Sequence, residues 1–445
     1  MTTYLRKLGL FSGTMAVVGG IIGGGIFRTP ATVAERVGTP GAVLVTWAIG
    51  GAVALIGAFV WGELGQRRPR AGGQYVYLRE TFGALPAFLY AWTLTLIIAT
   101  GAIAAVAVTF ADYAIALVGA AHRYSVPLAV AAVVLLSGIN YVGVRPAAIT
   151  QNIFTILKLA ALAVLIAAGL FVAAPAPPFH FVAPAPPSHF AALGTALVPI
   201  LFTYGGWQQT NFIAEEIVEP ERSLPRALII GVAIVITVYV LTNVAYLRIL
   251  GVGGLAASTA PAADVMDRLL GPVGGKIIAA GIAVSTFGFL NLVILVTPRV
   301  LQAMAADGLF FQKLAVLHPR YHTPTFAIVA LAVCAIILTL SGTFGQLVDY
   351  VTFGDWIFFG LTAAGLFVYR NRESGARSQG REPPDSRLLA PSFRVPGYPV
   401  TPALFVLAAA FVVSSAIASN PRNAAIGAGL IALGIPAFLY WRSRP

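Results

Sequence analysis

The sequence predicts an all-α polytopic membrane protein with twelve transmembrane helices, and three observations support this fold class. Of the 445 residues, 58% are apolar and 10% are charged, whereas soluble domains average about 45–50% and about 25%. Apolar runs are long and continuous, and the run at 159–174 contains no polar side chain. The runs also lack the apolar–polar alternation of membrane barrel strands, which argues against a transmembrane barrel.

A helix crosses the bilayer with about 20 mostly apolar residues. In chain order, such runs lie at 10–36, 41–66, 83–118, 126–144, 149–174, 192–216, 226–250, 273–306, 323–341, 345–369, 399–418 and 422–441. The number of runs is even, so both termini are expected on the same side of the membrane. No cleavable signal peptide is predicted, because the first run is rich in glycine rather than a short plain apolar core.

The basic residues indicate which side the termini occupy. With a cytoplasmic N-terminus, 20 of the 28 Lys and Arg residues fall on the cytoplasmic side and six on the other, leaving Arg28 and Lys158 within spans. Cytoplasmic loops carry the excess of basic residues, so we expect both termini inside and the protein in the inner (cytoplasmic) membrane. The positive-inside distribution of the basic residues therefore explains the net charge of +12, and no nucleic acid partner is expected.

The loops and the rarer residues exclude further classes. The outer loop 175–191 is proline-rich, and the pentapeptide APAPP occurs at 174–178 and 183–187, which favours a semi-rigid spacer over a recognition site. The arginine-rich inner loop 370–398 is expected near anionic headgroups, although orientation alone explains its charge.

The single cysteine, Cys334, excludes an intrachain disulfide. The five histidines lie in loops without a metal-ligand pattern, so no metal, cofactor or enzymatic activity is expected.

Two predicted spans contain segments that disfavour a continuous helix. The first has five glycines in seven positions at 19–25, followed by Pro30, and the sixth has FTYGGW at 202–207, preceded by Pro199. Each glycine costs about 1 kcal/mol relative to alanine in a helix interior, so both segments are expected to unwind. Glycine-interrupted segments at corresponding positions of two halves indicate a transporter binding site. For either cluster alone, close helix packing through small residues is the alternative.

The spacing of the two breaks predicts an internal repeat. Spans one and six are five apart, and because five is odd the repeats must be inverted. We expect a first five-helix repeat at 1–174, a second at 192–369, and two peripheral helices with a short tail at 399–445. The free N–H and C=O groups of broken helix ends suit the carboxylate and ammonium of a zwitterion such as an amino acid.

Charged residues within the spans are further candidates. Lys158 lies about ten residues into the fifth span, about 14 Å deep, which is far for its side chain to reach the interface. A buried lysine must pair with acceptors or lose its proton, and it would tie the fifth helix to the first; access to water through a crevice is the alternative. Asp355, in the tenth span, is a candidate for proton handling or for a structural hydrogen bond. Arg28 is a candidate outer gate or an interfacial anchor.

A gate at the inner ends of the spans is also predicted. The acidic residues Glu63, Glu215 and Glu216 fall at the same membrane face as three arginines, namely Arg67, Arg68 and Arg70. Their proximity favours an inner ion-pair gate, with ordinary interfacial charge as the alternative.

The chain closely resembles the amino acid, polyamine and organocation (APC) transporter superfamily and, within it, the L-amino acid transporter branch. The matching stretches are GGIIGGGIFRTP at 19–30, GELGQRRPRAGGQYVYL at 62–78, FTILKL at 154–159, FTYGGWQQTNFIAEEIVEPERSLPRAL at 202–228 and STFGFLNLVILVTPRVLQAMAADGL at 285–309. The resemblance covers about 8–442. It implies the LeuT-like fold, in which two inverted five-helix repeats, with helices 1 and 6 broken, carry two peripheral helices.

The resemblance also implies roles for individual residues. The N–H groups of Gly23, Gly24 and Gly25 would bind the substrate carboxylate. The substrate amine would lie on the carbonyls of Ile21, Phe202 and Gly205, with Thr203 in the same break, and Phe202 would also form an aromatic lid. Lys158 matches the lysine that replaces a sodium site in sodium-independent members. Two departures affect side-chain preference: the family often has serine at the position of Gly24, and Gln208 replaces an asparagine of some members for large neutral substrates.

These features predict a sodium-independent secondary transporter of L-amino acids that works by alternating access, through exchange or proton symport. Neither break contains an acidic residue, which favours neutral substrates over the alternative of cationic amino acids or polyamines. A non-transporting amino acid sensor of the same fold is the alternative of another class, and ring-like selectivity sequences of a channel are missing. Eukaryotic members of the branch use an outer-loop cysteine to join a glycoprotein. Cys334 lies in the ninth span, so the chain resembles the stand-alone prokaryotic form, without a disulfide-linked heavy chain.

Overall fold

The computed structural model describes residues 3–172, 189–342, 344–378 and 392–443, with the side chains of 189–192, 344–353 and 375–378 outside the description. Residues 175–188 of the predicted outer loop 175–191 and residues 379–391 of the predicted inner loop 370–398 lie outside these ranges. The described chain is helical, and its strand-like pairing is an isolated parallel bridge between Leu8 and Ile217.

The helices follow one another with short connections. Their bounds are α1 Leu10–Ile21, η1 Gly25–Phe27, α2 Thr29–Val37, α3 Pro40–Arg67, α4 Gln74–Phe82, α5 Ala84–Thr93, α6 Ala99–Val118, η3 His122–Tyr124, α7 Ser125–Val142, α8 Val144–Phe171, α9 His189–Thr203, η4 Trp207–Glu216, α10 Pro220–Ala256, α11 Pro261–Leu270, α12 Pro272–Ala306, η5 Gln312–Ala315, α13 Thr325–Ser341, α14 Phe344–Ser378, α15 Val400–Ser419, α16 Pro421–Ala432 and α17 Gly434–Arg442. A π-helix, Leu94–Ile98, joins α5 to α6.

The predicted spans coincide with these helices. One helix or a group of consecutive helices occupies each of the twelve predicted ranges, with ends that differ by up to nine residues. Within the described residues, eight helical segments are long and apolar enough to cross a membrane, and α1 and α13 are shorter apolar helices. The chain is therefore a multi-pass membrane protein by its helical content.

Proline and glycine set many of the helix ends. Proline occupies the first turn of α3, α10, α11, α12 and α16, where its missing N–H group costs no hydrogen bond. The Thr39 side chain caps α3 by accepting a hydrogen bond from the Ala42 N–H at 3.3 Å. Gly38, Gly119 and Gly342 follow helix ends in the left-handed region, which glycine adopts without strain.

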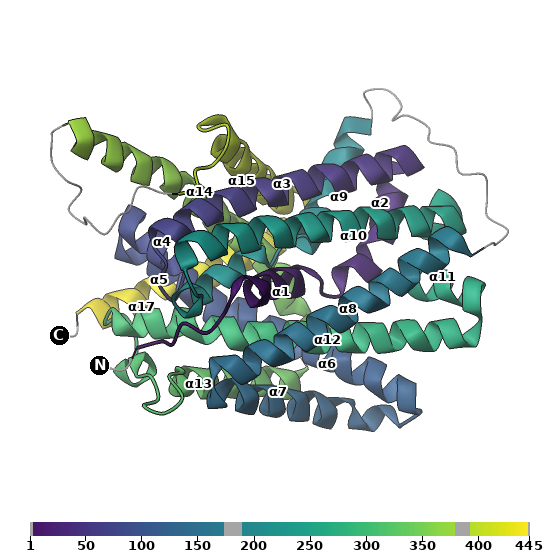
Figure 1. Cartoon of the computed structure of the whole chain (residues 1–445), viewed down its shortest axis with the longest axis horizontal. Coiled ribbons are helices and arrows are strands. Elements are labelled where there is room, and N and C mark those ends of the chain that lie inside the picture. The colour runs from purple at the N-terminus through teal and green to yellow at the C-terminus, as the bar shows by residue number, and fades with distance from the viewer. Residues whose placement is uncertain (1–2, 173–188, 343, 379–391, 444–445) are drawn as a thin grey trace.

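The short helix α1 lies at the centre of the bundle. It packs against α8, α10, α12 and η4, while α10 also packs against α3, and α12 against α6 (Figure 1). Figure 1 shows both chain termini at one end of the bundle and α2 and α11 toward the other end. We call the first end the basic face, since α3 ends there at Arg67 and is followed by Arg68 and Arg70. The second end is called the opposite face.

Candidate functional site

The first predicted break lies between α1 and α2. The chain leaves helical geometry at Ile22 (φ −76°, ψ 90°), and the Gly23 N–H donates to the Ile21 carbonyl at 2.9 Å. The N–H groups of Gly24 and Gly25 donate to no acceptor in the described part of the chain. Gly24 is exposed, and a Cβ atom on it would meet no atom within 4 Å. The break thus offers two free backbone donors, one of them beside open space.

The second predicted break follows α9. The Gly205 N–H donates to the Phe202 carbonyl at 3.0 Å, and Gly206 adopts φ +110°, which favours glycine. The Gln208 side chain folds back, so that its Oε1 atom accepts from the Gly206 N–H at 2.9 Å. The Phe202 ring is 52% exposed. Among the described residues, no donor reaches the Gly205 carbonyl, so this break offers a free acceptor next to an exposed aromatic residue.

The two breaks contact each other through glycine. A Cβ atom on Gly206 would lie 2.2 Å from the Gly20 carbonyl oxygen, and one on Gly25 would lie 2.7 Å from the Thr203 Cγ2 atom. The Thr203 hydroxyl also shares a hydrogen bond of 2.8 Å with the Thr29 hydroxyl. Close packing therefore accounts for Gly20, Gly25 and Gly206, whereas it does not account for the open surroundings of Gly24.

Lys158 connects α8 to the end of α1. Its side chain is fully buried, and its Nζ atom donates to the carbonyls of Ile22 at 2.7 Å and Gly19 at 3.2 Å. The Ser285 hydroxyl of α12 also reaches the Ile22 and Gly23 carbonyls, both at 3.3 Å. The last carbonyls of a helix lack intrahelical partners and carry partial negative charge, so they suit a buried ammonium. Lys158 thereby anchors α1 where the helix breaks.

Tyr239 of α10 joins the two breaks from another side. Its hydroxyl donates to the Ile21 carbonyl at 3.0 Å and lies 3.4 Å from the Thr203 carbonyl. The Trp47 ring packs edge-on against Tyr239, with ring centroids 5.6 Å apart. Sequence reasoning missed Tyr239, and the only signal was a hydroxyl-bearing residue within an otherwise apolar run.

The other two predicted candidates lie outside this group of contacts. Arg28 is exposed between the first break and α2, and its guanidinium makes no hydrogen bond or ion pair within the described ranges. Asp355 is half-buried on α14, which packs mainly against α15, α16, α4 and α6, and its carboxylate likewise has no hydrogen bond or ion pair within those ranges. The structure thus brings both breaks and Lys158 together and leaves Asp355 on a separate helix.

The basic face is closed by the N-terminal segment. The N–H groups of Lys7 and Leu8 donate to the Glu216 carbonyl at 2.9 and 3.0 Å, and the Val218 N–H donates to the Leu8 carbonyl at 2.8 Å. The Glu216 carboxylate forms a two-point ion pair with Arg299, with N–O distances of 3.0 and 3.1 Å. Arg299, which the sequence analysis counts among the basic residues of the cytoplasmic side, is a fully buried residue of α12.

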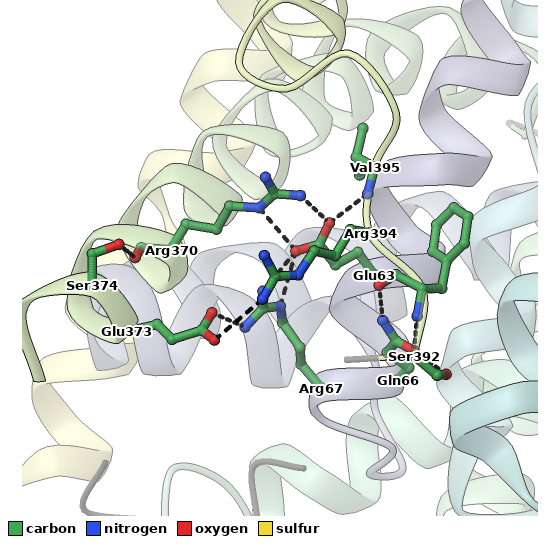
Figure 2. Close-up of polar contacts among 10 residues, drawn as sticks. Glu63, Gln66, Arg67, Arg370, Glu373, Ser374, Ser392, Arg394 and Val395 are labelled. Carbon is green, nitrogen blue, oxygen red and sulfur yellow. Dashed lines mark hydrogen bonds and ion pairs between the residues drawn. The ribbon is translucent and has the colours of Figure 1, made fainter. Parts of the chain in front are cut away.

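A second buried carboxylate, that of Glu63, contacts three segments at the basic face. Figure 2 shows Glu63, at the end of α3, between arginines of α3 and α14 and the segment that precedes α15. Its oxygens accept from Arg67 at 2.7 Å, Arg370 at 2.6 Å and the Val395 N–H at 2.7 Å. Arg67 also donates to Glu373 at 3.0 Å (Figure 2). These contacts join α3 and α14 to the segment that leads into α15.

The ion pairs at the basic face follow the predicted gate only in part. Glu63 pairs with Arg67, which is four residues away on the same helix. Glu216, however, pairs with Arg299, and Arg68 pairs with Glu80. The prediction paired residues that are close in the sequence, but α12 and α4 contribute further charged residues to this face. At the breaks themselves, Gly24 and Phe202 are exposed.

The described residues contain no group of three His, Cys, Asp or Glu side chains that would hold a metal ion. The site is instead made of backbone donors, backbone acceptors, one ammonium and an aromatic ring. This arrangement offers hydrogen-bond donors and acceptors of the kind that a polar ligand needs, and its described residues contain no nucleophile paired with a base.

Comparison with known proteins assigns this architecture to a family. A family model described as amino acid permease matches residues 8–440. The chain is 34% identical over 427 residues to b(0,+)-type amino acid transporter 1 of Homo sapiens, which covers 94% of this chain and 84% of the relative. It is 32% identical over 459 residues to Asc-type amino acid transporter 1 of Mus musculus, covering 99% and 82%.

A third relative is the large neutral amino acids transporter small subunit 2 of Homo sapiens, with 31% identity over 455 residues, 99% of this chain and 82% of the relative. All three relatives are named as amino acid transporters rather than enzymes. The family model and these relatives span nearly the whole chain, including both breaks and Lys158. The chain therefore belongs to the amino acid permease family of membrane transporters.

Proposed function

We propose that this protein is a secondary transporter that moves neutral L-amino acids across the cytoplasmic membrane by alternating access. The observation that carries the proposal is the pair of broken helices, which face each other at the centre of the bundle. Together they leave both backbone N–H donors and backbone C=O acceptors unpaired. The names of the relatives support amino acids as the substrate class.

The unpaired backbone groups match the two charges of an amino acid. The carboxylate would bind the free N–H groups of Gly24 and Gly25, at the start of the helical turn after the first break. The ammonium would bind the carbonyls of Gly205 and Phe202, which keep acceptor capacity. Ile21 is a weaker candidate than the sequence suggested, because its carbonyl already accepts from Gly23 and Tyr239.

The surroundings of the site favour a neutral side chain. No Asp or Glu occurs in the stretches 19–30 and 202–211 that form the breaks, so a cationic side chain would lack a carboxylate partner there. Gly24 adds no side chain, and Gln208 is turned back toward Gly206, which leaves room beside the first break. The exposed Phe202 ring is placed to cover a bound substrate from the opposite face.

Lys158 supports transport without sodium. Its ammonium donates hydrogen bonds to the carbonyls of Gly19 and Ile22. A fixed positive charge therefore lies at the unwound helix end, whose carbonyls would otherwise attract a cation. Energy coupling would then come from amino acid exchange or from protons, and Asp355, half-buried on α14, is the candidate proton carrier.

The closed basic face suggests the orientation and the motion. We place this face in the cytoplasm, because basic residues concentrate there, and both termini with it. The helices of the two predicted repeats, at 1–174 and 192–369, would rock so that the contacts of Leu8, Glu216 and Arg299 open as the opposite side closes. The peripheral part at 399–445 would remain outside this motion.

Reconstitution of the purified chain into proteoliposomes tests the proposal. We expect counterflow of radiolabelled L-leucine or L-alanine without sodium, and comparison with uptake driven by an imposed pH gradient separates exchange from proton symport. Flux by the chain alone also supports a stand-alone transporter. Transport of cadaverine but of no amino acid would contradict the neutral substrate, and leucine binding without flux would favour a sensor.

A further inference from the structure

A cavity of about 270 Å³ lies at the basic face, separate from the two breaks. Its walls are the N-terminal segment at Thr3 and Tyr4, the first turns of α4, the end of α12, and Glu215 at the end of η4. The volume equals that of roughly nine molecules of liquid water, which is enough for one amino acid. None of the predicted binding residues lines it.

Most charged groups in the wall are already paired. Arg79 and Asp307 form an ion pair at 2.8 Å, and the Tyr75 hydroxyl donates to the same carboxylate at 2.8 Å. Burial and the Asp307 carboxylate raise the pKa of Tyr75 above its usual range, so the phenol stays protonated and remains a donor. Glu80 accepts from Arg68 and from the Tyr369 hydroxyl. These groups hold the wall together and leave little charge for a ligand.

Two opposite charges remain in the wall. The exposed Arg70 guanidinium makes no hydrogen bond or ion pair with any residue that the structure describes. The half-buried Glu215 carboxylate accepts one hydrogen bond, from the Ala71 N–H to Oε2 at 3.1 Å, which leaves its other oxygen available. A ligand that satisfies both groups must carry one anionic and one cationic group, as a zwitterion does.

We propose that this cavity is a second amino acid site, in which Arg70 binds the carboxylate and Glu215 binds the ammonium of a neutral amino acid. A planar guanidinium matches a carboxylate through two parallel hydrogen bonds. The ligand side chain would lie against Val76, Ala303 and Leu317, which provide apolar surface without a third free charge. The choice of an amino acid as ligand rests on the proposed function.

Occupancy of the cavity would keep the basic face closed. Tyr4 lies in the N-terminal segment that is clamped to Glu216, and Glu215 is next to that residue, whereas Val76 and Ala303 belong to α4 and α12. A bound amino acid would therefore bridge the elements that must separate when this face opens. A ligand that binds only the closed state shifts the population toward it. High amino acid concentration at the basic face would thus slow transport, as feedback by accumulated substrate.

Equilibrium binding of radiolabelled L-leucine to the purified full-length chain tests the number of sites. We expect two leucine molecules per wild-type chain and one in Arg70→Gln, and also one in Ala306→Trp, which fills the cavity from the end of α12. Arg145→Gln is the matched control, because Arg145 is an exposed arginine at the start of α8 that does not line the cavity. This control should keep two sites.

Proteoliposome flux gives a second readout. Leucine at the basic face should inhibit uptake by the wild-type protein, and Arg70→Gln should raise the inhibitory concentration about tenfold or more, since a charge-assisted hydrogen bond is lost. One leucine per wild-type chain together with counterflow would overturn the second site and leave the proposed function intact. Two sites that persist in both cavity variants would overturn it as well. Absence of both leucine binding and flux would instead count against the proposed function.

Discussion

The Lys158 ammonium donates to the Ile22 carbonyl at 2.7 Å and so joins α8 to the point where α1 breaks. Both residues are buried, and a second bond from the same ammonium to Gly19 completes the contact. The positive charge is thus stabilised by backbone carbonyls rather than by a carboxylate. Substitutions of Lys158 therefore act on the shape of the first break.

Lys158→Ala should strongly reduce leucine counterflow. The substitution removes the ammonium donor from the Gly19 and Ile22 carbonyls, of which Ile22 keeps a 3.3 Å bond from Ser285. A buried group left unsatisfied costs about 1–3 kcal/mol. Thermal unfolding in detergent should also shift to lower temperature. Lys276→Ala is the control, because Lys276 is an exposed residue near the start of α12. Wild-type flux in Lys158→Ala would show that the contact is dispensable for transport.

Sodium provides a separate test of the same contact. In Lys158→Ala the carbonyls of Gly19 and Ile22 no longer bind an ammonium and become available to a small cation, so sodium chloride should raise its unfolding temperature relative to choline chloride. The wild-type protein should respond equally to both salts. An equal response in the variant would mean that the ammonium does not occupy a cation site.

Gly206→Ala should prevent the two breaks from packing. Its Cβ atom would lie 2.2 Å from the Gly20 carbonyl oxygen, and alanine disfavours the φ of +110° at this position. We expect a large loss of stability in thermal unfolding, or loss of folded protein. Gly24→Ala is the matched comparison, because Gly24 has φ −82° and open space around its Cβ position, and it should unfold near the wild-type temperature. Similar destabilisation of both variants would contradict this close approach.

Tyr239→Phe should slow counterflow and lower stability moderately. It removes the hydroxyl that donates to the Ile21 carbonyl and lies near that of Thr203, with an expected cost of about 1–3 kcal/mol for buried acceptors. Tyr113→Phe on α6 serves as the control, since the Tyr113 hydroxyl has no hydrogen bond among the described residues. Unchanged flux and unfolding temperature in Tyr239→Phe would rule out a role for this hydroxyl in holding the breaks.

Glu216→Gln should destabilise the closed basic face. Removing one partner of a buried ion pair leaves the Arg299 charge uncompensated, which typically costs about 3–5 kcal/mol. The double variant with Arg299→Met should recover part of the lost stability, because no buried charge is left unpaired. Glu35→Gln, at an exposed site of α2, is expected to have little effect on unfolding. If the double variant were no more stable than Glu216→Gln, the unpaired Arg299 charge would not be the source of the lost stability.

Much of the helical layout could be predicted from local sequence. Long apolar runs marked the helices, and the glycine clusters marked both interruptions, because these signals depend only on nearby residues. The short helices α4 and α11 and the π-helix at Leu94–Ile98 were not predicted, since they lack the length and uniform hydropathy of a span. The positions of Lys158 and the breaks in the sequence were enough to suggest that they belong to one site.

The partners of the buried polar groups required the tertiary structure. Tyr239, Arg299 and Glu216 come from distant parts of the chain, and no local pattern indicates which of them meet. The same holds for the cavity beside Arg70, whose walls belong to five separate segments. The sequence by itself determined the membrane class, the helices and the places where they break, through composition and backbone preference. Only the packing of helices decided which glycines touch and which carbonyls remain free, because these properties depend on distances between residues far apart in the chain.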